Sequence, residues 1–153
     1  MPAKAESIIV PPMPGSGDWE LFPHGADVGV RGHGATREAA FANAAYAMTA
    51  ALAEADHVRP LRAVEIVCAA PDDELLLVDW LNALIYEMAT RKMLFSRFTV
   101  HMEGENLTGE AWGEPIDIAR HKPGVEIKGA TYTALRVAQE GDGRWLAQCV
   151  VDV

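Results

Sequence analysis

The chain has 153 residues, of which 50% are hydrophobic and 23% are charged, so it has the composition of an ordinary soluble protein and the length of a single domain. Acidic residues number 22 against 13 basic ones, and the formal net charge is -9. Because a protein that grips a nucleic-acid backbone needs a basic face, this balance disfavours strong direct binding of nucleic acid. An acidic surface suits a basic protein partner or a cation.

The N-terminal stretch is rich in proline and glycine, with three prolines between positions 11 and 14 followed by Gly-Ser-Gly. We predict that residues 1–17 form a flexible extension and that residues 18–153 form one folded domain. No run of residues approaches the roughly 20 apolar positions of a membrane span, and we expect a cytoplasmic protein. Cys68 and Cys149 lie in apolar runs outside any CxxC pair, which favours two reduced thiols; a disulfide between adjacent strands is the alternative.

The first expected elements are a β-hairpin and a helix. Residues 19–22 alternate as a short strand that Pro23 ends, and residues 27–31 form a second strand after a His-Gly-Ala turn. Thr36 is a good N-cap for the helix that follows, and Glu38 suits its first turn because the helix dipole favours an anion there. The apolar stripe of this helix is rich in alanine, which lets a helix lie close to a sheet. Its members are Phe41, Ala44, Ala45, Met48 and Leu52.

A Val/Ile-rich strand over residues 61–69 precedes a second helix, which Asp72 caps. The apolar side chains of this helix recur at i, i+3, i+4 and i+7. They are Leu77, Trp80, Leu81, Leu84, Ile85 and Met88. After Arg91 and Lys92 the period changes to two, and the remainder indicates strands and turns, with a strong hairpin turn at 141–143.

The order of elements is two strands, a helix, a strand, a second helix and about four strands. Helices separated by a single strand and followed by an antiparallel meander are typical of an α+β fold. We predict a two-layer sandwich in which both helices pack on one face of a mixed, largely antiparallel β-sheet.

Familiar catalytic motifs are absent: the chain has no P-loop lysine motif, no GxSxG elbow and no HExxH. The stretch VGVRGHGATREAA places G-x-G between a strand and a helix, but Arg37 at the third glycine position of a dinucleotide fingerprint would obstruct close packing. We expect His57 and His121 to be solvated in polar loops. His24 and His33 flank the second strand and could meet in space.

Two aspartates are the most informative polar residues. Asp27 follows a turn and opens a strand, where a hydrogen bond to backbone is the usual explanation. Asp152 sits in the final strand beside the carboxylate of Val153. If these two strands were neighbours, an all-oxygen set would converge, which suits a hard cation such as calcium or magnesium. A solvated terminal aspartate is the alternative.

Four stretches, in order and with compatible spacing over roughly residues 19 to 153, together resemble the archease family. They are HGAD with VGVRGHG and AFANAAYAM, VDWLNALIYEMATRKMLFSRF, GEPIDIARHKPGVEIKGATY, and the closing VDV. The chain departs from the family pattern at Gly25, where threonine is usual, at Gly129-Ala130, and at Thr133, where histidine is common. These departures affect groups around the site and not its carboxylates.

The resemblance implies a non-catalytic activator of the GTP-dependent tRNA-splicing RNA ligase, which promotes guanylylation of the ligase and its multiple turnover in tRNA splicing or RNA repair. It implies a divalent cation, Ca²⁺ with Mg²⁺ or Mn²⁺ as alternatives, held by Asp27, Asp152 and Val153. Lys128 matches a lysine required for activity, contacting phosphate or the partner, and His24 is an orienting neighbour. The expected partner is the ligase protein. We expect this chain neither to bind nucleic acid strongly by itself nor to associate with a membrane.

Two other functions stay open. One is a metal-dependent hydrolase or phosphotransferase that uses Asp27, Asp152 and His24, although it lacks a recognisable nucleophile or general base. The other is a chaperone-like adaptor that works without a metal. Insensitivity to a chelator would favour the adaptor, and turnover of phosphate esters by the protein alone would favour the enzyme.

Overall fold

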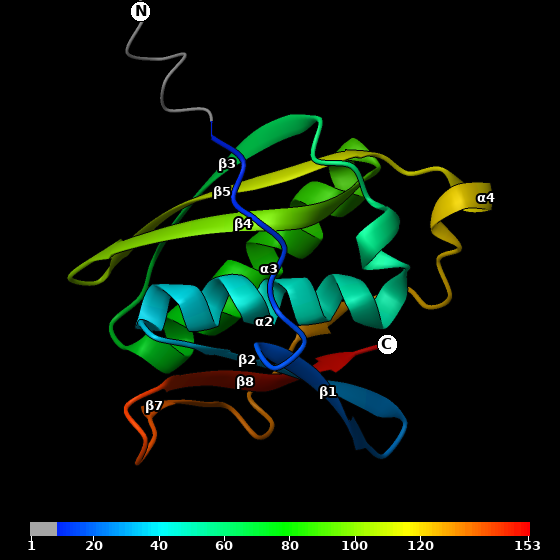
Figure 1. Ribbon diagram of the computed structural model, residues 1–153. Helices are drawn as coiled ribbons and strands as arrows, with labels where there is room; N and C mark the ends of the chain where they lie inside the picture. Colours follow the sequence, from blue (N-terminus) through cyan, green and yellow to red (C-terminus); the bar gives the residue numbers. More distant parts are fainter. Residues whose placement is uncertain (1–8) are drawn as a thin grey trace, which may run out of the picture.

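Helix α2 (Arg37–Leu52) lies between two antiparallel sheets in the computed structural model, which describes residues 9–153 (Figure 1). Sheet A has the strand order β1-β2-β8-β6, with β7 also paired to β8. Its strands are β1 (Trp19–His24), β2 (Asp27–Gly34), β8 (Trp145–Asp152), β6 (Gly129–Ala130) and β7 (Arg136–Gln139). Sheet B has the order β3-β5-β4, with β3 (Arg62–Ala69), β5 (Asn106–Pro115) and β4 (Met93–Glu103).

The alanine-rich stripe of α2 lets its backbone lie directly on β2. Thr36 caps the helix as expected, and its hydroxyl accepts from the backbone N–H of Ala39 at 3.1 Å. A Cβ atom on Gly32 would fall 2.2 Å from the backbone of Ala40 and of Ala44. No side chain larger than hydrogen therefore fits at position 32, and glycine and alanine together fix the spacing of this contact.

Helix α3 (Asp73–Arg91) contacts strands of both sheets. The side chain of Asp72 caps it by accepting from Leu75 N at 2.9 Å, and Lys92 ends it in the left-handed region at φ 55°. Trp80 is fully buried, and its indole N–H donates to the Phe41 carbonyl of α2 at 3.1 Å, which ties the two helices together.

The predicted α+β class and the antiparallel strand pairing are confirmed. One sheet with both helices on a single face was expected, whereas the strands divide into two sheets with helices between them. The division arises because β3, which lies between the two helices in the sequence, pairs with β5, while β2 pairs with β8. Two short helical turns, η1 (Ala55–His57) and α4 (Ile118–His121), occupy segments expected to be irregular.

The first hairpin is longer than expected. Strand β1 continues through Pro23 to His24, which is possible because β1 is an edge strand and Pro23 need not donate to a neighbour. The chain then reverses at Gly25, whose φ of +59° is in the left-handed region.

Both cysteines are free, as expected, and lie in different sheets, so the alternative of a disulfide between adjacent strands is wrong. Burial raises the pKa of the Cys149 thiol to about 12. Burial and then the charge of Asp79 raise the pKa of Cys68 to about 11. Neither thiol is an activated nucleophile.

The expected extension falls partly on residues 1–8, which lie outside the described residues. Residues 9–17 contain neither helix nor strand, and they run across α2 near β4 (Figure 1). No helix in residues 9–153 is both long enough and apolar enough to span a bilayer.

Candidate functional site

The two aspartates singled out in the sequence face each other on neighbouring strands. Val28 of β2 pairs with Val151 of β8, so Asp27 and Asp152 are the next opposed positions at the end of the ladder. Val28 and Val151 pack on the core, and alternation therefore turns the aspartates to the opposite face of sheet A, away from α2. Asp152 is exposed and Asp27 is half-buried.

Val153 and Lys128 join the aspartates through backbone contacts. The Val153 N–H donates to Oδ1 of Asp27 at 3.2 Å, and the Lys128 N–H donates to the carbonyl of Asp152 at 2.7 Å. The structure thus brings together all four residues that the sequence singled out for cation binding and activator function. The side chain of Lys128 is exposed, and no ion pair holds its ammonium within residues 9–153.

His24 lies in the same row of sheet A, where it pairs with Asp27 across the first hairpin. The row continues to Gly129, which pairs with Asp152 from the other side. No side-chain hydrogen bond joins His24 to Asp27 in the described part of the chain, so His24 is adjacent but not a demonstrated orienting group. His33 contacts Glu20 at 2.9 Å instead of meeting His24.

The site is rich in oxygen, and within residues 9–153 no basic side chain neutralises its aspartates by direct pairing. Among the described residues no lysine, arginine or histidine forms an ion pair with Asp27 or Asp152. No group of three or more His, Cys, Asp and Glu side chains suited to a metal is present in residues 9–153. Any cation here would depend on two aspartates and main-chain oxygen atoms of Val153.

The departures from the family pattern occur at structural positions around this row. Gly25 forms the hairpin turn with positive φ, which suits glycine. Ala130 donates its N–H to the Asn82 side chain of α3 at 2.9 Å, which fixes the strand after Lys128 against the helix. The carbonyl of Thr133 accepts from Val150 N at 3.1 Å.

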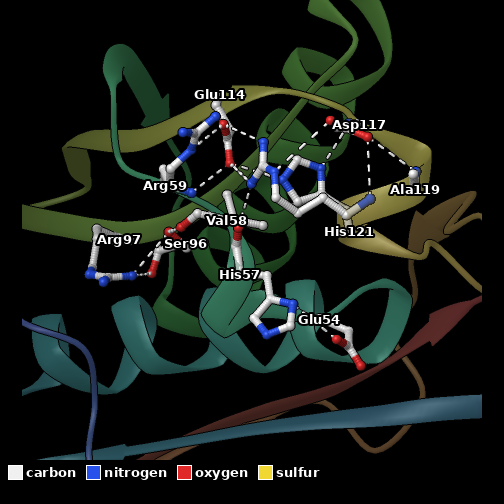
Figure 2. A network of polar contacts seen from close by, with 11 residues as sticks. Glu54, His57, Val58, Arg59, Ser96, Arg97, Glu114, Asp117, Ala119 and His121 are labelled. Atoms are coloured by element: carbon white, nitrogen blue, oxygen red, sulfur yellow. Dashed lines mark hydrogen bonds and ion pairs between the residues drawn. The ribbon is translucent and has the colours of Figure 1, made fainter.

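Sequence reasoning missed a buried ionic network around Glu114, at the end of β5 (Figure 2). The carboxylate, 2% exposed, accepts two hydrogen bonds from the Arg120 guanidinium, at 2.6 and 2.9 Å. The Arg59 N–H donates at 2.7 Å and the Arg59 side chain at 3.1 Å. Arg120 holds the pKa of Glu114 well below its ordinary value, aided by Arg59 and His121, against the opposing effect of burial.

His121 belongs to this network, so the expectation that it is solvated was wrong. Its side chain is 0% exposed, and Nδ1 accepts from the Asp117 N–H at 2.9 Å. A neutral ring then carries its proton on Nε2, which donates to Glu114 at 2.9 Å. The signal in the sequence was four charged or titratable residues within EPIDIARH, a segment that periodicity does not resolve. His57 is half exposed and pairs with Glu54 at 3.1 Å.

The network positions the segment that leads to Lys128. It fixes α4, which Asp117 caps through the N–H groups of Ala119 and Arg120. The carbonyl of His121 accepts from Glu54 N at 3.1 Å, and Gly124 N donates to Leu52 O at 2.8 Å. Residues 117–124 are therefore anchored to the C-terminal end of α2 before the chain reaches the candidate site.

Comparison with known proteins places the chain among relatives of one kind. The model of the Archease protein family matches residues 19–153. Protein archease of Pyrococcus furiosus is 34% identical over 139 residues, covering 88% of this chain and 98% of the relative. Protein archease of Methanopyrus kandleri is 38% identical, covering 88% and 99%.

Solved structures agree with this relationship. The solution structure of a Methanobacterium thermoautotrophicum protein superposes with a TM-score of 0.78 at 30% identity, covering 89% of this chain and 99% of that one. The crystal structure of a Thermotoga maritima archease, described as a possible chaperone, has a TM-score of 0.57 at 19% identity and covers 88% and 96%, which supports the fold alone. The family match over most of the chain and the identity to the relatives establish that the chain belongs to the archease family.

Proposed function

We propose that this chain is a non-catalytic activator of a GTP-dependent tRNA-splicing RNA ligase, promoting guanylylation of the ligase and its multiple turnover. The observation that carries the proposal is the convergence of Asp27, Asp152, Val153 and Lys128 at one end of sheet A. These residues are separated by up to 126 positions along the chain, and the fold brings them together at its surface.

The donor atoms available at this site suit a hard divalent cation, and Ca²⁺ is the one we propose. The carboxylates of Asp27 and Asp152 and the main-chain oxygen of Val153 offer only oxygen, which Ca²⁺ and Mg²⁺ prefer and which is a poor match for zinc. A bound cation would supply positive charge for the phosphates of a nucleotide. The carboxylates would hold it in place, with other ligand positions left to water or phosphate.

Lys128 is proposed to contact phosphate or a carboxylate of the ligase. Its backbone adjoins the row of aspartates, its side chain is exposed, and its ammonium, a compact cation, forms no ion pair among the described residues. The net charge of -9 supports a protein partner with a basic surface in place of direct RNA binding. A cytoplasmic location remains a prediction.

A multiple-turnover ligation assay with the cognate ligase tests the proposal. We expect Asp27→Asn and Lys128→Gln each to lower the stimulation of turnover by at least roughly tenfold, because each removes a charge that contacts the cation or phosphate. Asp79→Asn is the matched control, since Asp79 is exposed on α3 and makes no ion pair within residues 9–153. Undiminished stimulation by a folded Asp27→Asn protein would exclude this site from the activity.

A chaperone-like adaptor is the second candidate, favoured by an apolar groove of about 280 Å³ between α3 and residues 116–127. Ile116 and Val125 line it and are partly exposed. Binding of the ligase that is unchanged by a chelator would support this candidate over a cation-dependent activator. No observation on the described residues favours the hydrolase alternative.

A further inference from the structure

A second groove, separate from the row of aspartates, lies between residues 13–16, the C-terminal half of α2 and the turn η1. It is open on one side and has a volume of about 700 Å³. Trp19 and Tyr46 line it with aromatic surface, and Glu54 and Asp56 line it with carboxylates. No lysine or arginine lines the groove, so its charge is negative at neutral pH.

The aromatic wall contains a polar group without a partner. The rings of Trp19 and Tyr46 meet edge to face with centroids 5.3 Å apart. Tyr46 is only 4% exposed, yet its hydroxyl has no hydrogen-bond partner among residues 9–153. The hydroxyl is reached by solvent, because the one enclosed side-chain polar atom without a partner in residues 9–153 is Trp112 Nε1, and Tyr46 lines the groove. Burial and then the charge of Asp56 raise the pKa of Tyr46, against the effect of Arg97, so the hydroxyl stays protonated.

The acidic rim of the groove is held rigidly by the Glu114 network (Figure 2). The backbone N–H of Glu54 donates to the His121 carbonyl at 3.1 Å. The Arg120 guanidinium, while it binds Glu114, also donates to the carbonyl of His57 at 2.8 Å. These contacts fix η1 at both ends, and a preformed site loses less entropy when a ligand binds.

We infer that this groove binds an arginine side chain presented by a basic segment of a protein partner. A guanidinium group is planar, stacks on aromatic rings and donates to carboxylates in a fork geometry, which an ammonium cannot do. Trp19, which is partly exposed, provides the ring for stacking and Tyr46 packs behind it. Asp56 provides an exposed carboxylate without an ion pair among the described residues, and the Tyr46 hydroxyl is a further acceptor. The net charge of -9 favours approach of a basic segment. The inference does not require that the partner be an RNA ligase.

The test is titration of the isotope-labelled full chain with the peptide Ser-Gly-Arg-Gly-Ser, followed by NMR. We expect saturable shifts of the Trp19 indole N–H and the Asp56 amide. The same peptide with citrulline in place of arginine is expected to bind at least roughly tenfold more weakly, because citrulline keeps the shape and loses the charge. Equal binding of the two peptides would overturn the inference.

Matched variants separate a specific groove from general attraction to an acidic surface. Asp56→Asn should weaken binding roughly tenfold and Tyr46→Phe several-fold, with unchanged melting temperatures. Glu105→Gln changes the charge equally at an exposed position outside the groove and should have no effect. Shifts scattered over the surface, equal losses in Glu105→Gln, or binding of methylguanidinium as tightly as the peptide would contradict a site for a protein segment.

Discussion

At the scale of single residues, Gly32 shows how one position sets the distance between two elements. Its Cα lies against the backbone of α2, and an added Cβ would meet main-chain atoms of Ala40 and Ala44 that cannot rotate away. Relief would require α2 to move from β2, which would disturb the contact between the helix and sheet A.

We therefore expect Gly32→Ala to lower the free energy of unfolding by about 2 kcal/mol or more, through overpacking. Urea denaturation followed by circular dichroism measures the change. Gly124→Ala is the control, because a Cβ at position 124 meets nothing within 4 Å and φ there is not positive, so a change within about 0.5 kcal/mol is expected. Equal stability of the two variants would contradict the packing explanation.

Glu114 gives a prediction with a defined dependence on pH. Its pKa is lower in the folded chain than the ordinary value of 4.5, so the carboxylate stabilises the fold fully at pH values above 4.5. That contribution is lost as pH falls below 4.5 toward the folded pKa. Glu114→Gln should cost about 2 kcal/mol at neutral pH, because hydrogen bonds to a charged acceptor are lost.

Unfolding by urea across a pH series measures the effect. The difference in the free energy of unfolding between the wild-type protein and Glu114→Gln should become smaller as the pH is lowered. Glu105→Gln, at an exposed position, provides the comparison and should show no such narrowing. A difference in the free energy of unfolding that is constant from pH 7 to pH 3 would mean that the ionised form of Glu114 is not the stabilising one.

At the scale of elements, local chemistry determines where the helices begin. Thr36 and Asp72 cap α2 and α3 through single hydrogen bonds to the N–H three residues ahead, at 3.1 and 2.9 Å. These starts were predicted from the sequence because a cap and its helix are neighbours in the chain.

Thr36→Ala should lower the free energy of unfolding by about 1 kcal/mol, since it leaves the Ala39 N–H without its acceptor. Thr36→Ser keeps an acceptor oxygen and should retain most of the stability. Thermal unfolding of the three proteins in parallel measures both changes. A Ser variant as unstable as the Ala variant would assign the loss to packing of the threonine methyl group instead.

At the scale of the whole molecule, charge should govern the approach of a partner. Under the proposed function, an acidic chain with net charge -9 approaches a basic face of the ligase, so the association rate constant should fall roughly tenfold between low and high salt. Stopped-flow measurements over a range of ionic strength test this, with the dissociation rate expected to change less. An association rate that does not respond to salt would show that apolar contacts dominate the encounter.

The sequence predicted where helices and strands lie far better than which strands pair with each other. Helical spacing assigned an apolar stripe to α2, and all of its members are buried in the core: Phe41, Ala44, Ala45, Met48 and Leu52. The division into two sheets was not predicted, because a period of two says which face is apolar but not which strand lies beside it. The convergence of Asp27 with Asp152 was conditional on one such pairing, which β2 and β8 make. Glu114 was missed because its partners, Arg59 and Arg120, lie on either side of it in segments where the sequence shows no clear period.

The pairing of β2 with β8 also orders the events of folding. Sheet B is built from strands within residues 62–115, whereas β2 must wait for a strand more than 100 residues later, through the pairing of Val28 with Val151. During synthesis the β1–β2 hairpin therefore carries an unpaired edge while the rest of the chain emerges, which is the condition under which nascent strands associate wrongly. The three glycines in DVGVRGHG make β2 a weak template for such pairing. Two of these glycines, Gly32 and Gly34, also let α2 pack closely on β2 in the folded protein.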